Sequence, residues 1–162
     1  MKLWNDRAPE LAYLLNPPFC ARLLYTAAKA YSLECKQSIP FPLIYLVLPI
    51  VLHKETRLSV NSISKMSHWI SNHQELLVGF HQRARFFVQI TNEAMEYLLM
   101  TNYIAVDEKA CIYTNPKMRV LSETRLVCGD TRDCIKCARS IGKWFARSGD
   151  AKTIYISWGV RP

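Results

Sequence analysis

Apolar residues in the first third of the chain predict two helices separated by a loop. Asn16 followed by two prolines is typical of a helix start, because asparagine caps the first turn and proline fits it. Apolar residues then recur at the spacing of one helix face: Phe19, Leu23, Leu24, Ala27, Ala28 and Tyr31. Residues 36–41 are expected to form a loop. The apolar run 43–53 has the length of a buried helix rather than a strand, and Pro49 can kink it.

Weaker periodicity in the middle of the chain predicts a polar connection followed by two more helices. Residues 54–61 form the polar connection. Residues 64–71 form a short helix, and its inward side chains are Met66, Trp69 and Ile70. Residues 74–89 form a longer helix, and its buried side chains are expected to be Leu76, Leu77, Phe80, Ala84, Phe87 and Val88.

The period of the pattern changes from helix-like to strand-like after Asn102. Thr91 is the expected cap of the helix that ends there. The apolar positions of this helix are Ala94, Met95, Leu98 and Leu99. Residues 103–106 then alternate like a strand, residues 107–109 turn the chain, and residues 111–114 return as a second strand. Helix, strand, short turn and strand is the sequence form of a winged helix-turn-helix.

The C-terminal part is predicted to hold one strong helix and one short strand, whereas residues 118–127 are ambiguous. The helix covers residues 132–147 and ends at residues 148–150. Its apolar positions are Cys134, Cys137, Ala138, Ile141, Trp144 and Phe145. Residues 153–158 alternate like a final strand. The predicted fold class is therefore α+β and mainly α-helical, with a winged helix-turn-helix-like core, a β-hairpin wing, and a C-terminal helix plus short strand.

A length of 162 residues fits a single domain, 1–162. The patterns divide it into an N-terminal helical part (1–60), a winged-helix-like part (61–116), and a C-terminal helix and strand (117–162). Half of the residues are hydrophobic and 21% are charged, which excludes wholesale disorder.

The N-terminus and the longest apolar run predict a cytoplasmic protein without a membrane anchor. Residues 1–7 lack the basic, apolar and small-residue order of a secretory signal. The run 39–52 is too short to span a bilayer and is interrupted by prolines. Without export, the six cysteines are expected to stay reduced.

Basic residues outnumber acidic ones by 21 to 13, which gives a net charge of +8. This excess favours nucleic acid, an anionic membrane surface or an acidic protein as partner. Five cations recur along one face of the 132–147 helix, opposite its apolar side: Arg132, Lys136, Arg139, Lys143 and Arg147. This cationic stripe is a candidate contact for phosphates or an acidic partner, with an ordinary solvated face as the alternative. Lys54 and Arg57 are further candidate contact residues.

Motifs for catalysis, metal binding and nucleotide binding are missing from the sequence. Cys128, Cys134 and Cys137 have the spacing C-x5-C-x2-C, but no further ligand follows, so core packing is favoured over a metal or thiol-redox site. The four histidines, at positions 53, 68, 73 and 81, form no ligand pair. Neither a phosphate-binding glycine loop nor a G-x-S-x-G elbow occurs. The sequence therefore predicts no catalytic residue, no metal site, no cofactor and no enzyme activity.

The charge of the helix before the predicted wing opposes a DNA-binding function. This helix, residues 91–102, would be the recognition helix, and it carries Glu93 and Glu96 but no Lys or Arg. A helix that lies against phosphates should not be acidic. Winged helices also act as protein–protein modules, so the fold alone does not decide the function.

Short stretches spread over nearly the whole chain occur in an order that resembles a known family. They are residues 9–17 with 19–20, 40–43, 46–49, 52–54 with 56–57, 68–69, 78–80 with 83–85, 142–145 and 159–162. In this order they resemble the middle component of bacterial three-component ABC ATPase systems.

The resemblance implies a non-catalytic adaptor subunit. Such a protein couples an SMC/Rad50-like ABC ATPase to a separate effector in a complex that defends bacteria against phages and other invasive DNA. The ATP would belong to the ATPase partner. A contact with DNA inside the complex and a homodimer remain open. The alternative function is a winged-helix DNA-binding protein, and a third is a metal or thiol-redox module that uses Cys134 and Cys137.

Overall fold

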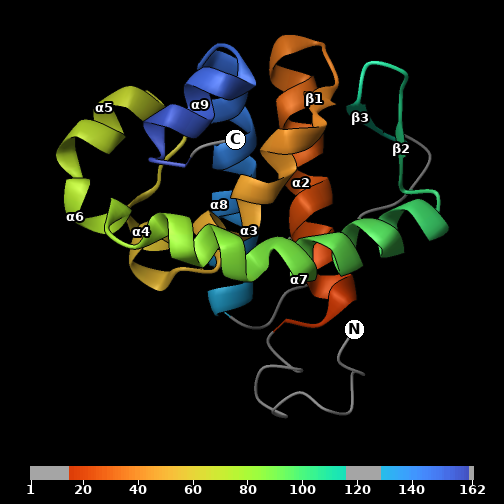
Figure 1. Ribbon diagram of the computed structural model, residues 1–162, viewed down its shortest axis with the longest axis horizontal. Coiled ribbons are helices and arrows are strands. Elements are labelled where there is room, and N and C mark those ends of the chain that lie inside the picture. Colours follow the sequence, from red (N-terminus) through yellow and green to blue (C-terminus); the bar gives the residue numbers. More distant parts are fainter. Residues whose placement is uncertain (1–14, 116–128, 161–162) are drawn as a thin grey trace.

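Helices dominate the part of the chain that the computed structural model describes, residues 15–115 and 129–160 (Figure 1). The α-helices are α2 (Pro17–Cys35), α3 (Ile44–Val51), α4 (Lys54–Ser59), α5 (Met66–Asn72), α6 (Gln74–Leu77), α7 (Phe80–Met100), α8 (Gly129–Arg147) and α9 (Ala151–Ser157). A short 3-10 helix, η2 (Phe41–Leu43), precedes α3. The strands are β1 (Ile39–Pro40), β2 (Ile104–Val106) and β3 (Cys111–Thr114). The predicted dominance of helices is confirmed.

Helix α2 begins where the sequence predicts. The Asn16 side chain accepts a hydrogen bond from the Phe19 N–H at 2.8 Å, which satisfies one of the N–H groups that a helix start leaves open. The helix ends at Lys36, whose φ of 60° turns the chain out of the helix while its N–H donates to the Ser32 carbonyl at 2.9 Å. Most of the predicted apolar face is buried.

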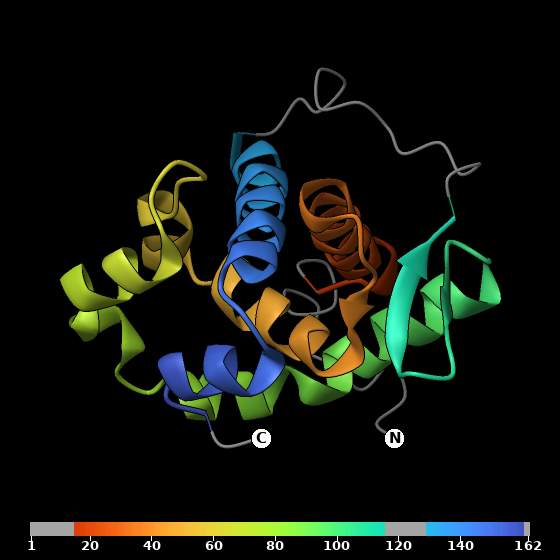
Figure 2. The ribbon, with the colours of Figure 1, turned by 90° about the horizontal axis from the view of Figure 1, so that it is seen from above.

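Helices α2 and α8 lie side by side, and their close approach depends on one glycine (Figure 2). A Cβ atom at Gly142 would overlap the Ala27 carbonyl oxygen and would lie 2.9 Å from the Ala30 Cβ. Glycine is the residue that fits this crossing, and the pair of helices forms the centre of the core.

The apolar run after η2 forms a buried helix, α3, as the sequence predicts. All of its side chains except Tyr45 are buried. Pro49 lies inside this helix, and its carbonyl oxygen accepts a hydrogen bond from the Arg83 Nε at 3.2 Å. The bond ties α3 to α7.

Four aromatic side chains pack together where α5, α7 and α8 meet the residue that follows α9. Trp69 of α5 lies 5.6 Å from Trp144 of α8 and 5.5 Å from Trp158, measured between ring centroids. Phe80, at the start of α7, lies 4.8 Å from Trp158. Burial of this cluster holds α5, α7, α8 and the residue after α9 together. The short helix predicted at residues 64–71 is confirmed, with Trp69 inward.

Two predicted boundaries around α7 are wrong. A continuous helix was expected over residues 74–89, but Gly79 adopts a φ of 70° and separates α6 from α7. Thr91 was expected to cap a new helix, but it lies inside α7 and is fully buried. Neither glycine nor proline interrupts residues 80–100, so the helix continues. Val88, expected to be buried, is 42% exposed.

The predicted hairpin is confirmed. Strands β2 and β3 pair antiparallel, with Ala105 opposite Tyr113. Strand β1 adds to the other edge of β3, with Ile39 opposite Ile112, so the order in the sheet is β1-β3-β2. Residues 36–41 were expected to be loop alone, and β1 forms within them because of this distant pairing. A helix followed by a hairpin is therefore present, and the winged-helix arrangement stays a prediction.

Two further predictions of secondary structure are wrong. Residues 54–61 contain α4, whose start is capped by the His53 side chain, with Nδ1 3.4 Å from the Thr56 N–H nitrogen. Residues 153–158 were expected to form a strand, but they belong largely to α9, which is capped by Asp150. The ambiguous residues 118–127 lie outside the described ranges. No helix within residues 15–115 and 129–160 is both long enough and apolar enough to cross a membrane.

Candidate interaction surfaces

The cationic stripe lies on the outer side of α8, as the helical spacing predicts. Its opposite side is buried at all six predicted apolar positions. Arg132, Lys136, Arg139 and Arg147 are exposed, whereas Lys143 is partly buried. The geometry therefore gives α8 a core side and a cationic side, and a role of the stripe in binding stays a prediction.

Arg147, the last residue of the stripe, also contacts two other parts of the chain. Its Nη2 lies 2.6 Å from Glu34 Oε1 at the end of α2, and its Nε donates to the same oxygen at 2.7 Å. Its Nη1 donates to the Ser62 carbonyl at 3.1 Å. Because Glu34 is distant in sequence, the spacing on α8 gave no sign of this acidic neighbour. Arg147 therefore has a local structural role beside any contact with a partner.

The two additional candidate contact residues differ in exposure. Lys54 is exposed at the start of α4. Arg57 is only 8% exposed, because its Nη1 donates to the Val51 carbonyl at 3.1 Å and its Nη2 lies 3.6 Å from Asp130. Burial of its guanidinium leaves little of Arg57 for a partner to reach, so the structure does not place it with Lys54 on one surface.

The cysteines on α8 pack in the core. Cys134 is 4% exposed and Cys137 is 3% exposed. Burial raises the pKa of the Cys137 thiol to about 12, and burial likewise raises the pKa of the Cys20 thiol to about 12. Thiols with such pKa values stay protonated at neutral pH, which opposes a nucleophilic role. Cys128 lies outside the described residues, and within residues 15–115 and 129–160 no three His, Cys, Asp or Glu side chains are grouped to hold a metal ion.

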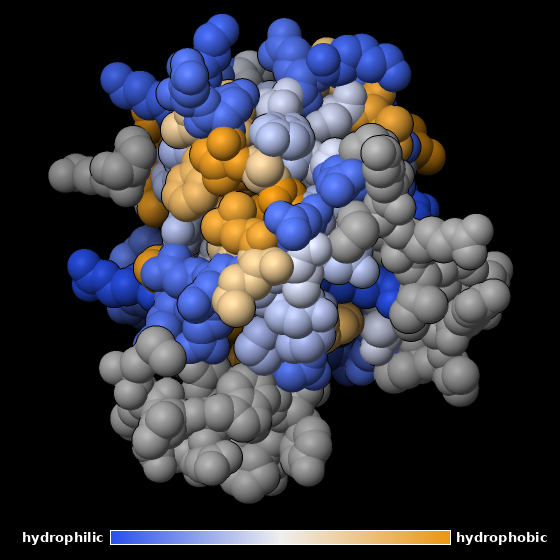
Figure 3. Space-filling view, turned by 90° about the vertical axis from the view of Figure 1, so that its right-hand side faces the viewer, coloured by the Kyte–Doolittle hydropathy of each residue, from blue (hydrophilic) through white to orange (hydrophobic). Residues whose placement is uncertain are grey.

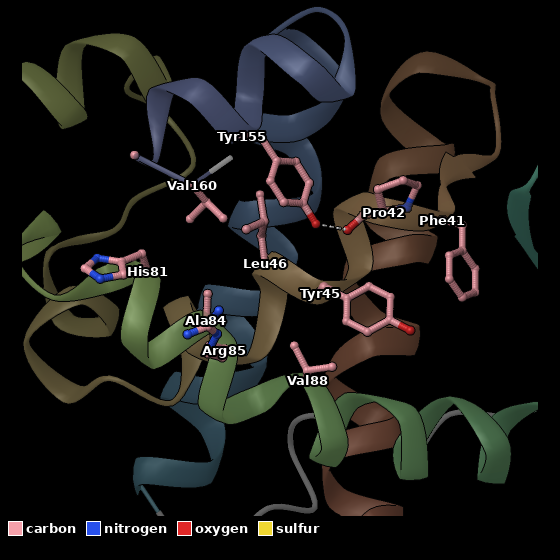
Figure 4. Close-up of a pocket in the computed structure, with 11 residues that line it drawn as sticks. Phe41, Pro42, Tyr45, Leu46, His81, Ala84, Arg85, Val88, Tyr155 and Val160 are labelled. Carbon is pink, nitrogen blue, oxygen red and sulfur yellow. Dashed lines mark hydrogen bonds between the residues drawn. The ribbon is translucent and has the colours of Figure 1, made fainter. Parts of the chain in front are cut away.

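A surface groove beside α7 was not anticipated from the sequence (Figure 4). It has a volume of about 800 Å³ and lies between the η2–α3 segment, the first half of α7, and the end of α9 with the residues that follow it. We name it the α7 groove. Its lining residues are Phe41, Pro42, Tyr45, Leu46, His81, Ala84, Arg85, Val88, Tyr155, Gly159 and Val160. The sign of this groove in the sequence is the spacing of His81, Arg85 and Val88, which places the three residues on one helix face.

Both tyrosine hydroxyls that line the α7 groove are engaged in hydrogen bonds. Tyr155 donates to the Pro42 carbonyl at 2.7 Å, the bond drawn in Figure 4, and the Tyr45 hydroxyl lies 2.7 Å from Asn92 Oδ1. Burial raises the pKa of both hydroxyls. These bonds fix the two rings as walls of the groove and hold α9 against η2.

The cationic stripe and the α7 groove lie on different sides of the protein. None of the residues that line the groove belongs to α8. Figure 2 shows α7 and α9 along one side and the first half of α8 toward the opposite side. A third face, around the hairpin, shows hydrophobic side chains near its centre with hydrophilic ones around them (Figure 3). Exposed apolar residues of the hairpin and the adjoining end of α7 include Leu99, Met100 and Val106.

Comparison with known families assigns the chain. The described residues define a mainly helical protein with a small antiparallel sheet and separate candidate surfaces. The chain belongs to the family of ABC-three component (ABC-3C) system Middle Component 3, whose model matches residues 4–162. The resemblance to middle components of three-component ABC systems is thereby confirmed. No curated protein and no solved structure matches the chain.

Proposed function

We propose that this chain is the non-catalytic adaptor of a bacterial anti-phage complex, where it couples an SMC/Rad50-like ABC ATPase to an effector in the cytoplasm. The observation that carries the proposal is membership of a middle-component family over residues 4–162. A component of a multi-protein ABC system has other subunits to contact. The proposed mechanism is a conformational relay. A conformational change of the ATPase, which depends on its bound nucleotide, is transmitted to the effector through this subunit.

Separate surfaces of different chemistry support this role. An adaptor that holds two proteins at once needs two contact areas that do not overlap. The cationic stripe offers charge, and the α7 groove offers apolar surface on another side. We assign the stripe to an acidic partner surface or to DNA phosphates, with Lys54 as a further contact.

Reconstitution with the ATPase and effector of the same system tests the adaptor role. We expect the ATPase and effector to associate only when this chain is present. The double variant Lys136→Glu, Lys143→Glu should lower the melting temperature only slightly, because Lys136 is exposed, Lys143 is only partly buried, and charges in such positions contribute little to folding. It should weaken assembly by about tenfold or more, since like charges at an interface are costly.

The matched control carries the same charge change outside the stripe. Lys65→Glu with Lys152→Glu replaces two exposed lysines, one just before α5 and one on α9, and neither belongs to the hairpin or to the lining of the α7 groove. This control should assemble like the wild type. Unchanged assembly and DNA binding by a folded stripe variant would reduce the stripe to a solvated face. Direct ATPase–effector association without this chain would refute the adaptor role.

A winged-helix DNA-binding protein is the second candidate, and the hairpin after α7 favours it. Residues 91–102 oppose it, because Glu93 and Glu96 lie there without a basic residue. A DNA binder should lose affinity steeply as salt rises, because bound phosphates release their counterions. Gel-shift titration of the isolated chain at several salt concentrations separates the two functions.

A further inference from the structure

The α7 groove combines an apolar lining with basic side chains on one wall. Apolar side chains come from all three segments that form it, among them Leu46, Val88 and Val160. His81 and Arg85 are the basic members, and none of the described residues that line the groove is acidic. A ligand with apolar groups next to a negative charge complements such a surface.

Arg85 differs from the neighbouring arginine of the same helix in how its charge is used. The Arg83 guanidinium donates to the carbonyls of Pro49 and Leu76, at 3.2 and 3.1 Å, and lies 5.2 Å from the centre of the Phe80 ring. Arg83 is therefore part of the fold. Arg85 is exposed, and no described residue pairs with its guanidinium. Its charge is available to a carboxylate that enters the groove.

The remaining polar groups of the groove do not compete for that carboxylate. The hydroxyls of Tyr45 and Tyr155 are occupied by Asn92 and by the Pro42 carbonyl. Their rings present apolar surface, and the basic wall formed by His81 and Arg85 is the place where charge is recognised. An occupant is thus oriented, with its acidic group toward α7 and its apolar groups toward α3 and Val160.

The groove is open to solvent rather than closed over a small molecule. Pro42, His81, Arg85, Val88 and Gly159 are all exposed along its rim. A volume of about 800 Å³ accommodates several side chains of a peptide. We infer that the α7 groove binds a peptide segment of a partner subunit in which bulky apolar residues stand beside Asp or Glu. The origin of this peptide in a subunit of the same complex rests on the proposed function. The expected chemistry of the peptide follows from the groove alone.

Selection from a random-peptide library on the full chain tests this chemistry without any partner protein. Enriched peptides should combine aromatic or aliphatic residues with Asp or Glu. A synthetic enriched peptide should bind the Val88→Glu variant at least about tenfold more weakly than the wild type, because the new side chain fills the groove and repels acid. Val88 is 42% exposed, so the variant should fold.

Matched controls separate the groove from general effects of charge. Val106→Glu changes a valine of similar exposure, 39%, outside the groove and should bind the peptide normally. Arg85→Glu should weaken binding. Lys152→Glu should not, because Lys152 lies on α9 but is not one of the residues that line the groove. A peptide in which Lys replaces the acidic residue should prefer the Arg85→Glu variant to the wild type.

Several outcomes would overturn the inference. They are enrichment of basic or uncharged peptides, no enrichment at all, and binding that Val88→Glu does not alter. If sedimentation shows a dimer of this chain that Val88→Glu dissociates, a second copy is the occupant and the inference is wrong. Peptide binding without assembly of the three subunits would refute the proposed function and leave the groove chemistry standing.

Discussion

Helices α7 and α8 differ in whether large apolar side chains are exposed on their outer sides. On α8, Ile141, Trp144 and Phe145 are covered within this chain, and the outer side carries cations. On α7, Phe86 is 57% exposed and Met100 is 77% exposed, although the inner side of the helix is buried just as well. We therefore expect the loss of a large apolar side chain to cost more stability on α8 than on the outer side of α7.

Removing one aromatic side chain from each helix gives the largest contrast. Trp144→Ala should lower the free energy of unfolding by about 3–5 kcal/mol, because a fully buried side chain leaves a cavity. Phe86→Ala should change it by about 0.5 kcal/mol or less, since that ring is already half in water. Denaturant unfolding measures both, and equal losses would remove the distinction between the two helices.

A single methyl group tests how closely α8 approaches α2. Gly142→Ala should lower the free energy of unfolding by about 1–3 kcal/mol through overpacking against the Ala27 carbonyl, even though alanine favours helix. Gly129→Ala, at the open start of the same helix, meets nothing within 4 Å and should not destabilise. Thermal melts of the two variants decide the matter. A more stable Gly142→Ala protein would mean that the helices separate at little cost.

The cysteines of α8 allow a smaller test of its buried side. Replacing both Cys134 and Cys137 with Ala should cost roughly 1–2 kcal/mol, through lost packing at two covered positions. Assembly with the partner subunits should persist. Elemental analysis provides the check on the metal alternative, because stoichiometric zinc that disappears with either substitution would contradict a packing role.

Alkaline pH tests the buried side of α8 through the protonation of a single thiol. Burial raises the folded-state pKa of Cys137 from 9.0 to about 12, so the unfolded chain releases this proton at a lower pH than the folded chain does. The stabilisation is complete below pH 9 and is lost as the pH rises toward the folded pKa. The decline in unfolding free energy above about pH 9 should therefore be shallower in Cys137→Ala. Identical slopes would show that this thiol is not protected on α8.

Helices and strands that are determined by their own residues could be predicted from the sequence. The hairpin follows from alternation on either side of a polar turn, and α8 follows from a long stripe of apolar residues. The start of α2 follows from Asn16 and the two prolines, and the hydrogen bond to the Phe19 N–H is present. In each case the deciding residues lie within one element, so distant contacts are not needed to form it.

The wrong assignments involve residues whose structure depends on distant neighbours. Ile154 and Trp158 are buried one helical turn apart, although the intervening apolar residues also fit a strand. Thr91 resembles a cap, yet packing of α7 against the core buries it inside the helix. The burial of Arg57, a candidate contact residue, likewise depends on distant groups, the Val51 carbonyl and Asp130, and its role in binding stays a prediction. The α7 groove escaped notice for the same reason, since three distant segments form it.

The order in which those three segments are synthesised has a consequence for assembly. Residues 41–46 and 81–88 leave the ribosome well before Tyr155 and Val160, which complete the groove. A nascent chain therefore lacks one wall of the groove until α9 has docked through the hydrogen bond from the Tyr155 hydroxyl to the Pro42 carbonyl. A partner that recognises the complete groove would bind only copies in which α9 has docked, so recruitment by that partner would itself act as quality control over the folding of this subunit.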